Sequence, residues 1–404
     1  MAEVRDFSLY ANKKNNIEDQ ISEPSYQEKI RNHRMLVFFR TVAIVAIAIV
    51  AVAIIYVNWR DKYYSTATVT QIAKITDATN STMLNLNGQI LMYSKDGVSL
   101  LNAQGTSLWN LTYQMQNPIS RSCQDVVAIG DYNGHYIYVA DSSGELGVID
   151  TNLPIRDFCV ASQGVVAAIL DDTDVTWIYL YDSQGNELAN FKTTMADSGY
   201  PIDVAISPSG ELVCVSYLYP EDGELKTSIA FYNFGSVGQN AIDNYASGYI
   251  YPSVVVPFVH FLNNKTAFAV SDDRIMFYNG SEVPVSGVEH LTGTDEIRSI
   301  YYSQDYIGLV FFNGTEEGEY RLEVYNDSGS KVSEEYFDIE YSNIFFSNGQ
   351  IIVYSDSDMI IYSNEGAIKY EGSFDQTVKA VIPTSIRSRF LLVTENAIYT
   401  MDLK

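Results

Sequence analysis

The stretch Gln89–Tyr113, QILMYSKDGVSLLNAQGTSLWNLTY, predicts three short β-strands joined by two tight turns. Three apolar runs supply the strands, because Val, Ile, Leu, Tyr and Trp pack well on a pleated surface. Asp96-Gly97 and Gln104-Gly105 supply the turns, since glycine adopts positive φ without a steric penalty. The stretch therefore indicates an antiparallel meander.

The same unit recurs along the rest of the chain. Each copy has an apolar strand, then Asp or Asn, then small residues and a glycine. The copies end at Gly105, Gly144, Gly185, Gly235, Gly280, Gly329 and Gly366. Successive glycines are 39, 41, 50, 45, 49 and 37 residues apart. A period of this length is typical of four-stranded propeller blades, whereas a parallel β-helix has shorter coils.

An eighth unit ends the chain and lacks one strand. Val378–Ile382, Arg389–Val393 and Ala397–Met401 predict its first three strands. A separate strand at Ser65–Ile72, STATVTQI, precedes the first complete unit and can supply the fourth. Pairing of the two ends closes the ring and removes exposed sheet edges. The predicted fold class is therefore all-β, an eight-bladed β-propeller, with seven blades as the second choice if the fourth or fifth unit is an insertion.

The N-terminal part has a different character. Residues 1–34 are polar and predict a cytoplasmic tail, and residues 35–58 predict one transmembrane helix that precedes the propeller at 59–404. Arg40 lies near one end, where its side chain can reach the headgroups, and Tyr56 and Trp59 lie at the other end as interfacial anchors. The apolar run is too long for a cleaved signal peptide, so an uncleaved signal-anchor fits better.

Basic residues set the expected orientation of this helix. Lys29, Arg31, Arg34 and Arg40 flank its N-terminal side, against Arg60 and Lys62 beyond it. The positive-inside rule then keeps the N-terminus in the cytoplasm and exports the propeller. The predicted localisation is the cell membrane, single-pass, with the propeller outside.

The charge of the chain excludes one class of partner. The formal net charge is −25, and residues 1–40 are nearly neutral with seven Lys/Arg and six Asp/Glu. The negative charge therefore belongs to the exported part. An acidic body of this kind repels polyphosphate, so nucleic-acid binding is disfavoured.

Two phrases carry a resemblance to a known group of propellers. DSQGNELANF (Asp182–Phe191) and NAQGTSLWNL (Asn102–Leu111) resemble the blade motif of quinoprotein-like (PQQ-type or WD-like) propellers, in which an Asp/Asn-x-x-Gly turn precedes a strand with a docking Trp. Trp109 stands at that place in one copy. The other copies carry Ala189, Val285 or Tyr370 there. The plan of an anchor followed by a propeller also resembles uncharacterised single-pass envelope proteins of bacteria, a likeness that implies no activity.

No motif predicts catalysis, a metal or a cofactor. His135, His260 and His290 lie in different units without Gly-x-Ser-x-Gly or His-Glu-x-x-His, which favours structural roles. The acidic segments Asp171–Asp174 and Asp356–Asp358 do not match the twelve-residue calcium loop and are better explained as turns.

The three cysteines, Cys123, Cys159 and Cys214, form neither a CxxC motif nor a metal spacing. Their strand-like surroundings predict buried free thiols. A Cys123–Cys159 bridge between neighbouring units stays open as an alternative, because an exported domain permits disulfides.

Two long connections are the candidate ligand site. Residues 217–226 (YLYPEDGELK) and 312–320 (FNGTEEGEY) each join the second and third strands of a blade, on the face that also carries the links between blades, such as Tyr245–Tyr251. Aromatic anchors with acidic surroundings suit a basic peptide, a polysaccharide or a partner protein. In the alternative interpretation these tyrosines pack blade against blade. The candidate residues are Tyr217, Tyr219, Tyr249, Tyr251, Glu221, Asp222, Glu316 and Glu317.

The sequence thus predicts a non-enzymatic binding or scaffold module, anchored in the membrane, for a protein, peptide or cell-envelope ligand. The alternative is an exported enzyme or a sensor with a sugar or quinone site at the propeller axis. A deep axial pocket lined by paired carboxylates would favour this alternative.

Overall fold

The structure is a computed structural model and describes residues 26–60, 62–75, 78–173, 175–195, 198–221, 223–293 and 295–404. Residues 1–25, which form most of the predicted tail, lie outside the described residues. The chain divides into two compact units, Met1–Lys62 and Tyr63–Lys404. Each unit is considered by itself.

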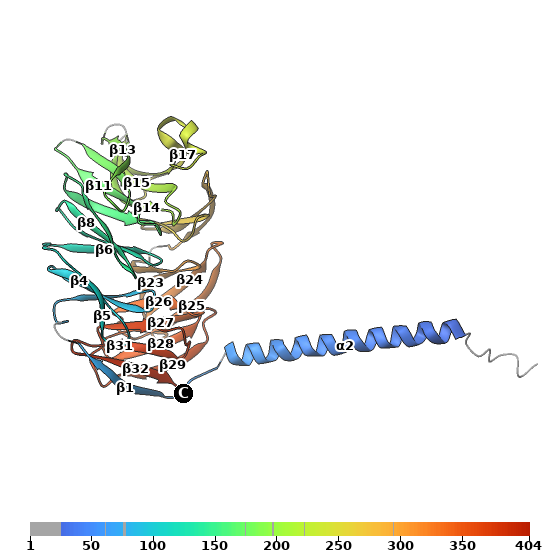
Figure 1. Ribbon diagram of the computed structural model, residues 1–404. Helices are drawn as coiled ribbons and strands as arrows, with labels where there is room; N and C mark the ends of the chain where they lie inside the picture. The colour runs from blue at the N-terminus through green and yellow to red at the C-terminus, as the bar shows by residue number, and fades with distance from the viewer. Residues whose placement is uncertain are drawn as a thin grey trace, which may run out of the picture. The chain divides into compact units, whose positions relative to one another are not determined.

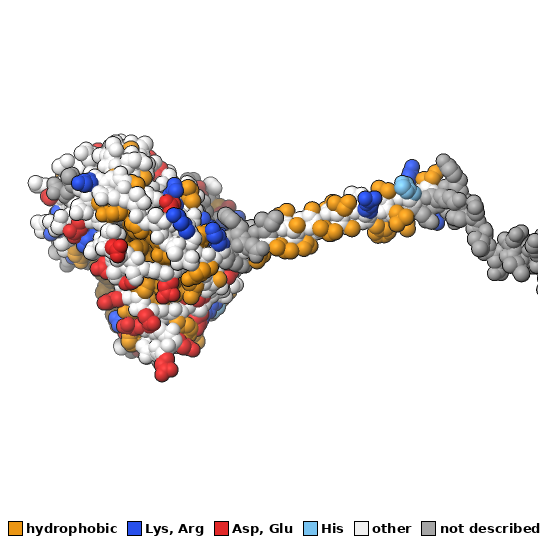
Figure 2. Space-filling model, turned by 90° about the horizontal axis from the view of Figure 1, so that it is seen from below, with side chains coloured by type: hydrophobic (Ala, Val, Ile, Leu, Met, Phe, Trp, Pro, Cys, Tyr) orange, Lys and Arg blue, Asp and Glu red, His pale blue; other side chains and the backbone are white. Residues whose placement is uncertain are grey.

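The first unit contains one long helix, α2 (Tyr26–Arg60). Within it His33–Ile54 has a mean hydropathy of 2.7 and is long and apolar enough to cross a membrane, although a signal sequence has the same properties. Apolar side chains cover the helix on the face shown in Figure 2. A helix that is apolar all round suits lipid better than water. Arg40 is exposed on α2. Tyr56 and Trp59 also belong to α2, but their side chains lie outside the described part.

The second unit consists of eight four-stranded antiparallel sheets, the blades (Figure 1). Blade 1 contains β2 (Thr82–Leu86), β3 (Gln89–Tyr93), β4 (Gly97–Leu101) and β5 (Ser107–Thr112). Blade 2 contains β6 (Pro118–Cys123), β7 (Val126–Asp131), β8 (Tyr136–Asp141) and β9 (Gly144–Asp150). Blade 3 contains β10 (Ile155–Val160), β11 (Val166–Asp171), β12 (Thr176–Tyr181) and β13 (Glu187–Thr193). Blade 4 contains β14 (Tyr200–Ile206), β15 (Leu212–Glu221), β16 (Glu224–Asn233) and β17 (Tyr245–Pro252), with the short 3-10 helices η1 (Gly238–Asn240) and η2 (Ile242–Asn244) before β17.

The remaining blades follow the same plan. Blade 5 contains β18 (Phe258–Phe261), β19 (Thr266–Val270), β20 (Arg274–Asn279) and β21 (Val285–Leu291). Blade 6 contains β22 (Ile297–Tyr302), β23 (Tyr306–Thr315), β24 (Gly318–Asn326) and β25 (Lys331–Phe337). Blade 7 contains β26 (Asn343–Ser347), β27 (Gln350–Tyr354), β28 (Asp358–Ser363) and β29 (Ile368–Ser373). Blade 8 contains β30 (Ala380–Pro383), β31 (Arg389–Val393), β32 (Ala397–Leu403) and β1 (Ala67–Lys74).

The two ends of the propeller meet in blade 8. β1 pairs antiparallel with β32, from Ala67 opposite Leu403 to Lys74 opposite Ala397. Figure 1 shows β1 beside β32 near the C-terminus. The sequence placed this strand two residues earlier, at 65–72. The backbone N–H groups of Ser65 and Thr66 do donate to the Lys404 carbonyl, at 3.0 and 3.4 Å, just before the regular ladder begins.

Eight clusters of buried apolar residues hold the blades together, and each cluster is shared by two neighbouring blades. Ile352 and Leu392 join blades 7 and 8, and Ile398 and Ile90 join blades 8 and 1. Eight interfaces between eight blades describe a closed ring. The prediction of eight blades is confirmed, and the fourth and fifth units are complete blades rather than insertions.

The repeated Asp/Asn-x-x-Gly phrase is the hairpin between the third and fourth strands. The Asn102 side-chain oxygen accepts from the N–H groups of Gln104 and Thr106, at 2.9 and 3.0 Å. Gly105 follows with φ +72°, and a Cβ on it would lie 3.3 Å from Ala73 of blade 8. The phrase therefore fixes a turn and also lets the hairpin approach the preceding blade. Gly97, by contrast, has φ +158°, which is nearly extended, and already belongs to β4.

Candidate ligand site on the propeller axis

Three of the four candidate tyrosines join blades together. Tyr217 is 2% exposed in the apolar cluster between blades 3 and 4, and its hydroxyl lies 3.0 Å from that of Tyr232 within blade 4. Tyr251 is 8% exposed, and its hydroxyl lies 2.7 Å from that of Tyr278 in blade 5. The Tyr249 hydroxyl donates to the Pro284 carbonyl of blade 5 at 3.0 Å. These placements match the packing interpretation of the tyrosines.

The other candidates lie on two separate hairpins. Tyr219 and Glu221 belong to β15 of blade 4, where the Glu221 carboxylate accepts from Lys226 Nζ at 2.7 Å. Glu316 and Glu317 are exposed at the hairpin between β23 and β24 of blade 6. Asp222 lies outside the described residues. Blade 5 stands between the two hairpins in the ring, so these acidic residues belong to separate blades. Their binding role stays a prediction.

A cavity of about 650 Å³ lies along the axis of the ring. It is lined mainly by β6, β10, β14, β18 and β22, the first strands of blades 2 to 6. First strands of neighbouring blades contact one another, for example β10 with β14 and β14 with β18. Since alternate residues of a strand point to opposite faces, these strands direct polar side chains into the same space. The volume is in the range of small-ligand sites.

An ion pair crosses from blade 2 to blade 3 in this cavity. Arg121 Nη2 donates to Asp157 Oδ1 at 2.8 Å, and Arg121 Nη1 donates to the Ser120 carbonyl at 3.1 Å. The Arg121 side chain is 43% exposed, and that of Asp157 is 22% exposed. Burial raises the pKa of Asp157, and Arg121 opposes this shift. The guanidinium thus lies at the cavity surface with Asp157 as its counter-ion.

A second carboxyl group, that of Asp203, lies nearby and is held by backbone hydrogen bonds. Asp203 Oδ1 accepts from the N–H of Val204 at 2.9 Å, and Oδ2 accepts from the N–H of Val259 in blade 5 at 2.7 Å. Among the described residues no ion pair involves Asp203. Burial and then the negative charge of Asp157 raise its pKa to about 7. Asp203 is therefore partly protonated near neutral pH.

Aromatic rings form another part of the wall. The rings of His260 and Tyr302 lie 3.9 Å apart between centroids, and Phe258 lies 5.9 Å from Tyr302. Tyr302 is 41% exposed in the cavity wall. Burial, with a smaller contribution from Arg121, lowers the pKa of His260 to about 3. His260 is therefore a neutral aromatic surface at physiological pH.

Cys123 and Cys159 are half-buried in the cavity wall, and Cys214 is buried. Cys123, Cys159 and Cys214 are free, and the first two line the cavity. Burial raises the pKa of Cys123 to about 11 and that of Cys159 well above its usual value. A thiol without thiolate character is a poor nucleophile and a poor metal ligand. Across the described ranges, no group of three or more His, Cys, Asp and Glu residues is placed to hold a metal ion.

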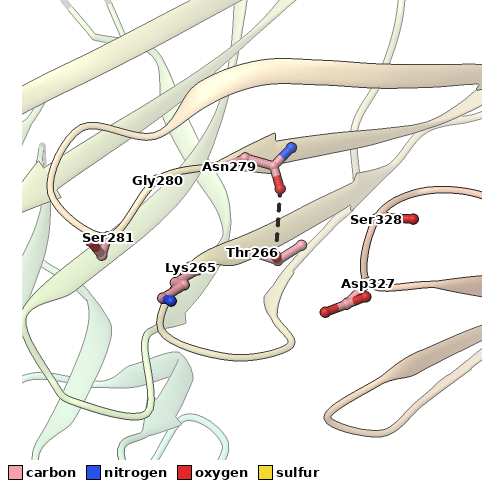
Figure 3. Close-up of a pocket in the computed structure, with 7 residues that line it drawn as sticks. All are labelled: Lys265, Thr266, Asn279, Gly280, Ser281, Asp327 and Ser328. Atoms are coloured by element: carbon pink, nitrogen blue, oxygen red, sulfur yellow. Dashed lines mark hydrogen bonds between the residues drawn. The ribbon is translucent and has the colours of Figure 1, made fainter. Parts of the chain in front are cut away.

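Two other hollows lie on the surface. One of about 560 Å³ adjoins the axial cavity at Pro257 and Phe258 and extends to Glu296 and Arg298. The other, of about 450 Å³, lies between the hairpins of blades 5 and 6 (Figure 3). In it Thr266 Oγ1 donates to Asn279 Oδ1 at 3.5 Å. The first hollow is lined by one aromatic and three charged side chains, Phe258, Asp272, Glu296 and Arg298, and the second has Lys265 and Asp327 as its charged groups.

Several solved structures are similar to this chain in fold. The C-terminal WD40 domain of Sif2 is 12% identical, with a TM-score of 0.54, covering 83% of this chain and 98% of that domain. Sqt1 from Chaetomium thermophilum, bound to the N-terminus of ribosomal protein L10, is 11% identical with a TM-score of 0.50, covering 85% of this chain and 98% of Sqt1. BamB from Moraxella catarrhalis is 13% identical with a TM-score of 0.47, covering 83% and 100%. The topology of the chain itself is that of an eight-bladed β-propeller, and the Sif2 domain and Sqt1 are similar to it in fold.

The family follows from a match along the whole propeller. Residues 60–403 match the model of a family of unknown function, DUF5711, and the chain belongs to that family. A search of curated proteins finds no significant match. At such low identities the solved structures establish the fold alone. The quinoprotein-like type implied by the blade phrases is not established by these matches.

The axial residues were missed by reasoning from sequence. Arg121, Asp157 and Asp203 each interrupt the first strand of a blade with a charge, in three consecutive blades. That pattern was the available signal, because first strands converge on the axis of a propeller. His260 was predicted to be structural because no catalytic motif accompanies it in the sequence. Its neighbour Tyr302 comes from the next blade, 42 positions later in the numbering.

Proposed function

We propose that this protein is a membrane-anchored binding module that takes its ligand into the axial cavity. The observation that carries the proposal is the set of unlike groups around one cavity: the Arg121–Asp157 pair, the unpaired carboxyl of Asp203 and the exposed ring of Tyr302. A few convergent polar groups in a largely apolar wall are the usual features of a ligand site. Sqt1 is an example of this fold bound to a segment of another protein.

A binding role accounts for the cavity better than a nucleophilic one. The thiols of Cys123 and Cys159 are held protonated, His260 is held neutral, and the Asp157 carboxylate is engaged by Arg121. Rigid first strands surround all these groups, as suits recognition by a preformed site.

Filling the cavity should abolish ligand binding. Ser122 is exposed in the cavity wall, so Ser122→Trp is expected to occupy the space without disturbing the blade core. We expect affinity for the native ligand, isolated with the wild-type protein from its own membranes, to fall by at least about tenfold. Ser236→Trp, at an exposed position after β16, is the matched control and should bind normally. Equal binding by both variants would place the ligand site elsewhere.

The helix supports a single-pass anchor with the N-terminus in the cytoplasm, as its flanking charges favour. The chain enters the propeller at Tyr63 and β1, so one covalent connection would hold the ring at the outer surface. Protease added to intact cells should leave an N-terminal epitope tag uncut, and permeabilisation should expose it. Cleavage of the tag in intact cells would show that the N-terminus lies outside and would contradict the proposed orientation.

An exported enzyme or sensor is the second candidate, because the cavity contains two carboxyl groups. Asp157 and Asp203 interact electrostatically, and Asp203 has a pKa of about 7, the value expected of a general acid or base. Turnover of a bound sugar that is lost in Asp203→Asn would favour catalysis over binding.

A further inference from the structure

The axial cavity has an excess of carboxyl groups over cations. Seven titratable or charged groups from five strands surround Asp203. They are Arg121 and Cys123 from β6, Asp157 and Cys159 from β10, Cys214 from β15, His260 from β18 and Tyr302 from β22. At neutral pH the thiols, the phenol and His260 are uncharged. One guanidinium therefore faces two carboxyl groups, and that guanidinium is already bonded to Asp157. Among the described residues Asp203 makes no ion pair of its own, although Arg121 also favours its charged form.

An anion is a poor occupant for this space. It would meet Asp157 and Asp203, and it would have to compete with Asp157 for Arg121. A cation meets the opposite situation, because Asp203 keeps lone pairs beyond the two that accept from the Val204 and Val259 N–H groups. The overall charge of −25 also raises the local concentration of cations.

The aromatic wall points to the same kind of ligand. The ring centroid of Tyr302 lies 3.9 Å from that of neutral His260 and 5.9 Å from that of Phe258. Aromatic faces attract ammonium and guanidinium groups, most strongly where water is excluded. A positively charged ligand would interact with both the Asp203 carboxyl and the aromatic wall, whereas a neutral sugar or a quinone has no positive charge to interact with them.

We propose that the axial cavity binds an ammonium or guanidinium group of its ligand, with Asp203 as the counter-ion and Tyr302 as the flanking ring. This inference rests on the proposed function, because it assumes that the cavity is the ligand site. A basic peptide segment and a free organic amine both present this chemistry, and the experiment below separates them.

Binding of a cation is coupled to the protonation of Asp203. In the empty cavity the carboxyl is partly protonated near pH 7, because burial and Asp157 disfavour its charge. An adjacent cation favours the carboxylate. The O–H proton of Asp203 then passes to the buffer as the cation arrives, so binding releases a fraction of a proton and tightens as the pH rises through 7.

Isothermal titration calorimetry of the full-length protein in detergent tests this proposal. The probes are acetyl-Gly-Arg-Gly-amide, the same peptide with citrulline in place of arginine, the same peptide with glutamate, and agmatine. We expect the arginine peptide to bind at least about tenfold more tightly than the citrulline peptide, which has a similar shape without the charge. Titrations at pH 7 in two buffers of different ionisation enthalpy should reveal release of protons on binding of the arginine peptide.

Two variants and a control locate the effect. Asp203→Asn should lower the affinity for arginine about tenfold and abolish proton release. Tyr302→Leu keeps Asp203 and should lower the affinity while leaving proton release intact, which keeps the proposal testable if Asp203→Asn folds poorly. Asp96→Asn, at an exposed hairpin of blade 1, should behave as the wild type. Tighter binding of the peptide than of agmatine assigns the cation to a peptide, and equal binding assigns it to a free amine; both support the site.

Other outcomes overturn the proposal in distinguishable ways. Equal binding of the arginine and citrulline peptides, or preference for the glutamate peptide, would reject a cation on Asp203. If Ser122→Trp still abolished binding of the native ligand, the axial site itself would stand. Arginine binding that Ser122→Trp leaves unchanged would place the cation outside the cavity and reject the inference.

Discussion

A chain that begins at residue 75 should unfold at least about 10 °C below a chain that begins at residue 63, because the longer chain keeps the closing strand. Without β1, the edge of β32 loses its partner from Ala67 to Lys74. Tyr64, which is 9% exposed, is also removed from the cluster between blades 7 and 8, together with Ala67 and Val69. One buried and two partly buried apolar side chains, together with the hydrogen bonds of the ladder, outweigh the entropy of a short segment.

The comparison of these two chains isolates closure from anchoring, since both lack α2. Thermal unfolding followed by near-ultraviolet circular dichroism measures the difference, and size-exclusion chromatography reports association through the open edge of β32. Equal midpoints with both chains monomeric would show that the β1–β32 pairing contributes little to the stability of the ring.

The second large effect is a loss of stability as the pH rises from about 4 to 8. The pKa values of Asp203 and Glu335 are raised from 3.8 and 4.5 to about 7 in the folded protein. Between the unfolded and folded pKa values, the folded chain binds more protons than the unfolded chain, so its stability falls as protons are removed. Asp203 alone contributes up to about 4 kcal/mol to this fall, by the linkage between a pKa shift and free energy.

The opposite slope is expected in acid. Hydrogen bonds lower the pKa values of Asp182 and Asp358, and a hydrogen bond from Arg274 lowers that of Asp273, so stability that depends on their charged forms is lost as the pH falls through their folded pKa values. Urea unfolding from about pH 2 to pH 8 measures both limbs of the profile. Asp203→Asn and Glu335→Gln should each reduce the fall in the free energy of unfolding between pH 4 and pH 8. A profile that is flat between pH 5 and 8 in the wild type would contradict the burial of uncompensated carboxyl groups.

The propeller fold could be predicted from the sequence because it depends on hairpin turns that form locally and recur along the chain. The Asn102–Gly105 turn fixes a hairpin by hydrogen bonds within five residues, and its copies recur at blade intervals. The need to close the ring then located the strand near residue 67. Small errors arose where tertiary contacts decide the outcome, as at Gly97, which pairs with Thr112 instead of forming the left-handed turn position.

The candidate ligand site could not be predicted from the sequence, because it depends on contacts between blades that are far apart in the chain. Whether Tyr217 and Tyr251 face solvent or a neighbouring blade depends on how sheets stack, which a strand pattern alone does not specify. Arg121, Asp157 and Asp203 are separated by 36 and 46 positions in the numbering and meet only because three first strands surround one axis. The prediction of a basic peptide, a polysaccharide or a partner protein on the two hairpins stays a prediction, and aromatic and acidic groups also meet in the axial cavity.

Hydrogen exchange with and without acetyl-Gly-Arg-Gly-amide tests most directly the claim that the ligand enters the axis of a closed ring. The account predicts increased protection in β10, β14 and β18, including the Val259 N–H that is bonded to Asp203, and no change in the hairpins 217–226 and 312–320. Protection confined to those two hairpins would contradict it.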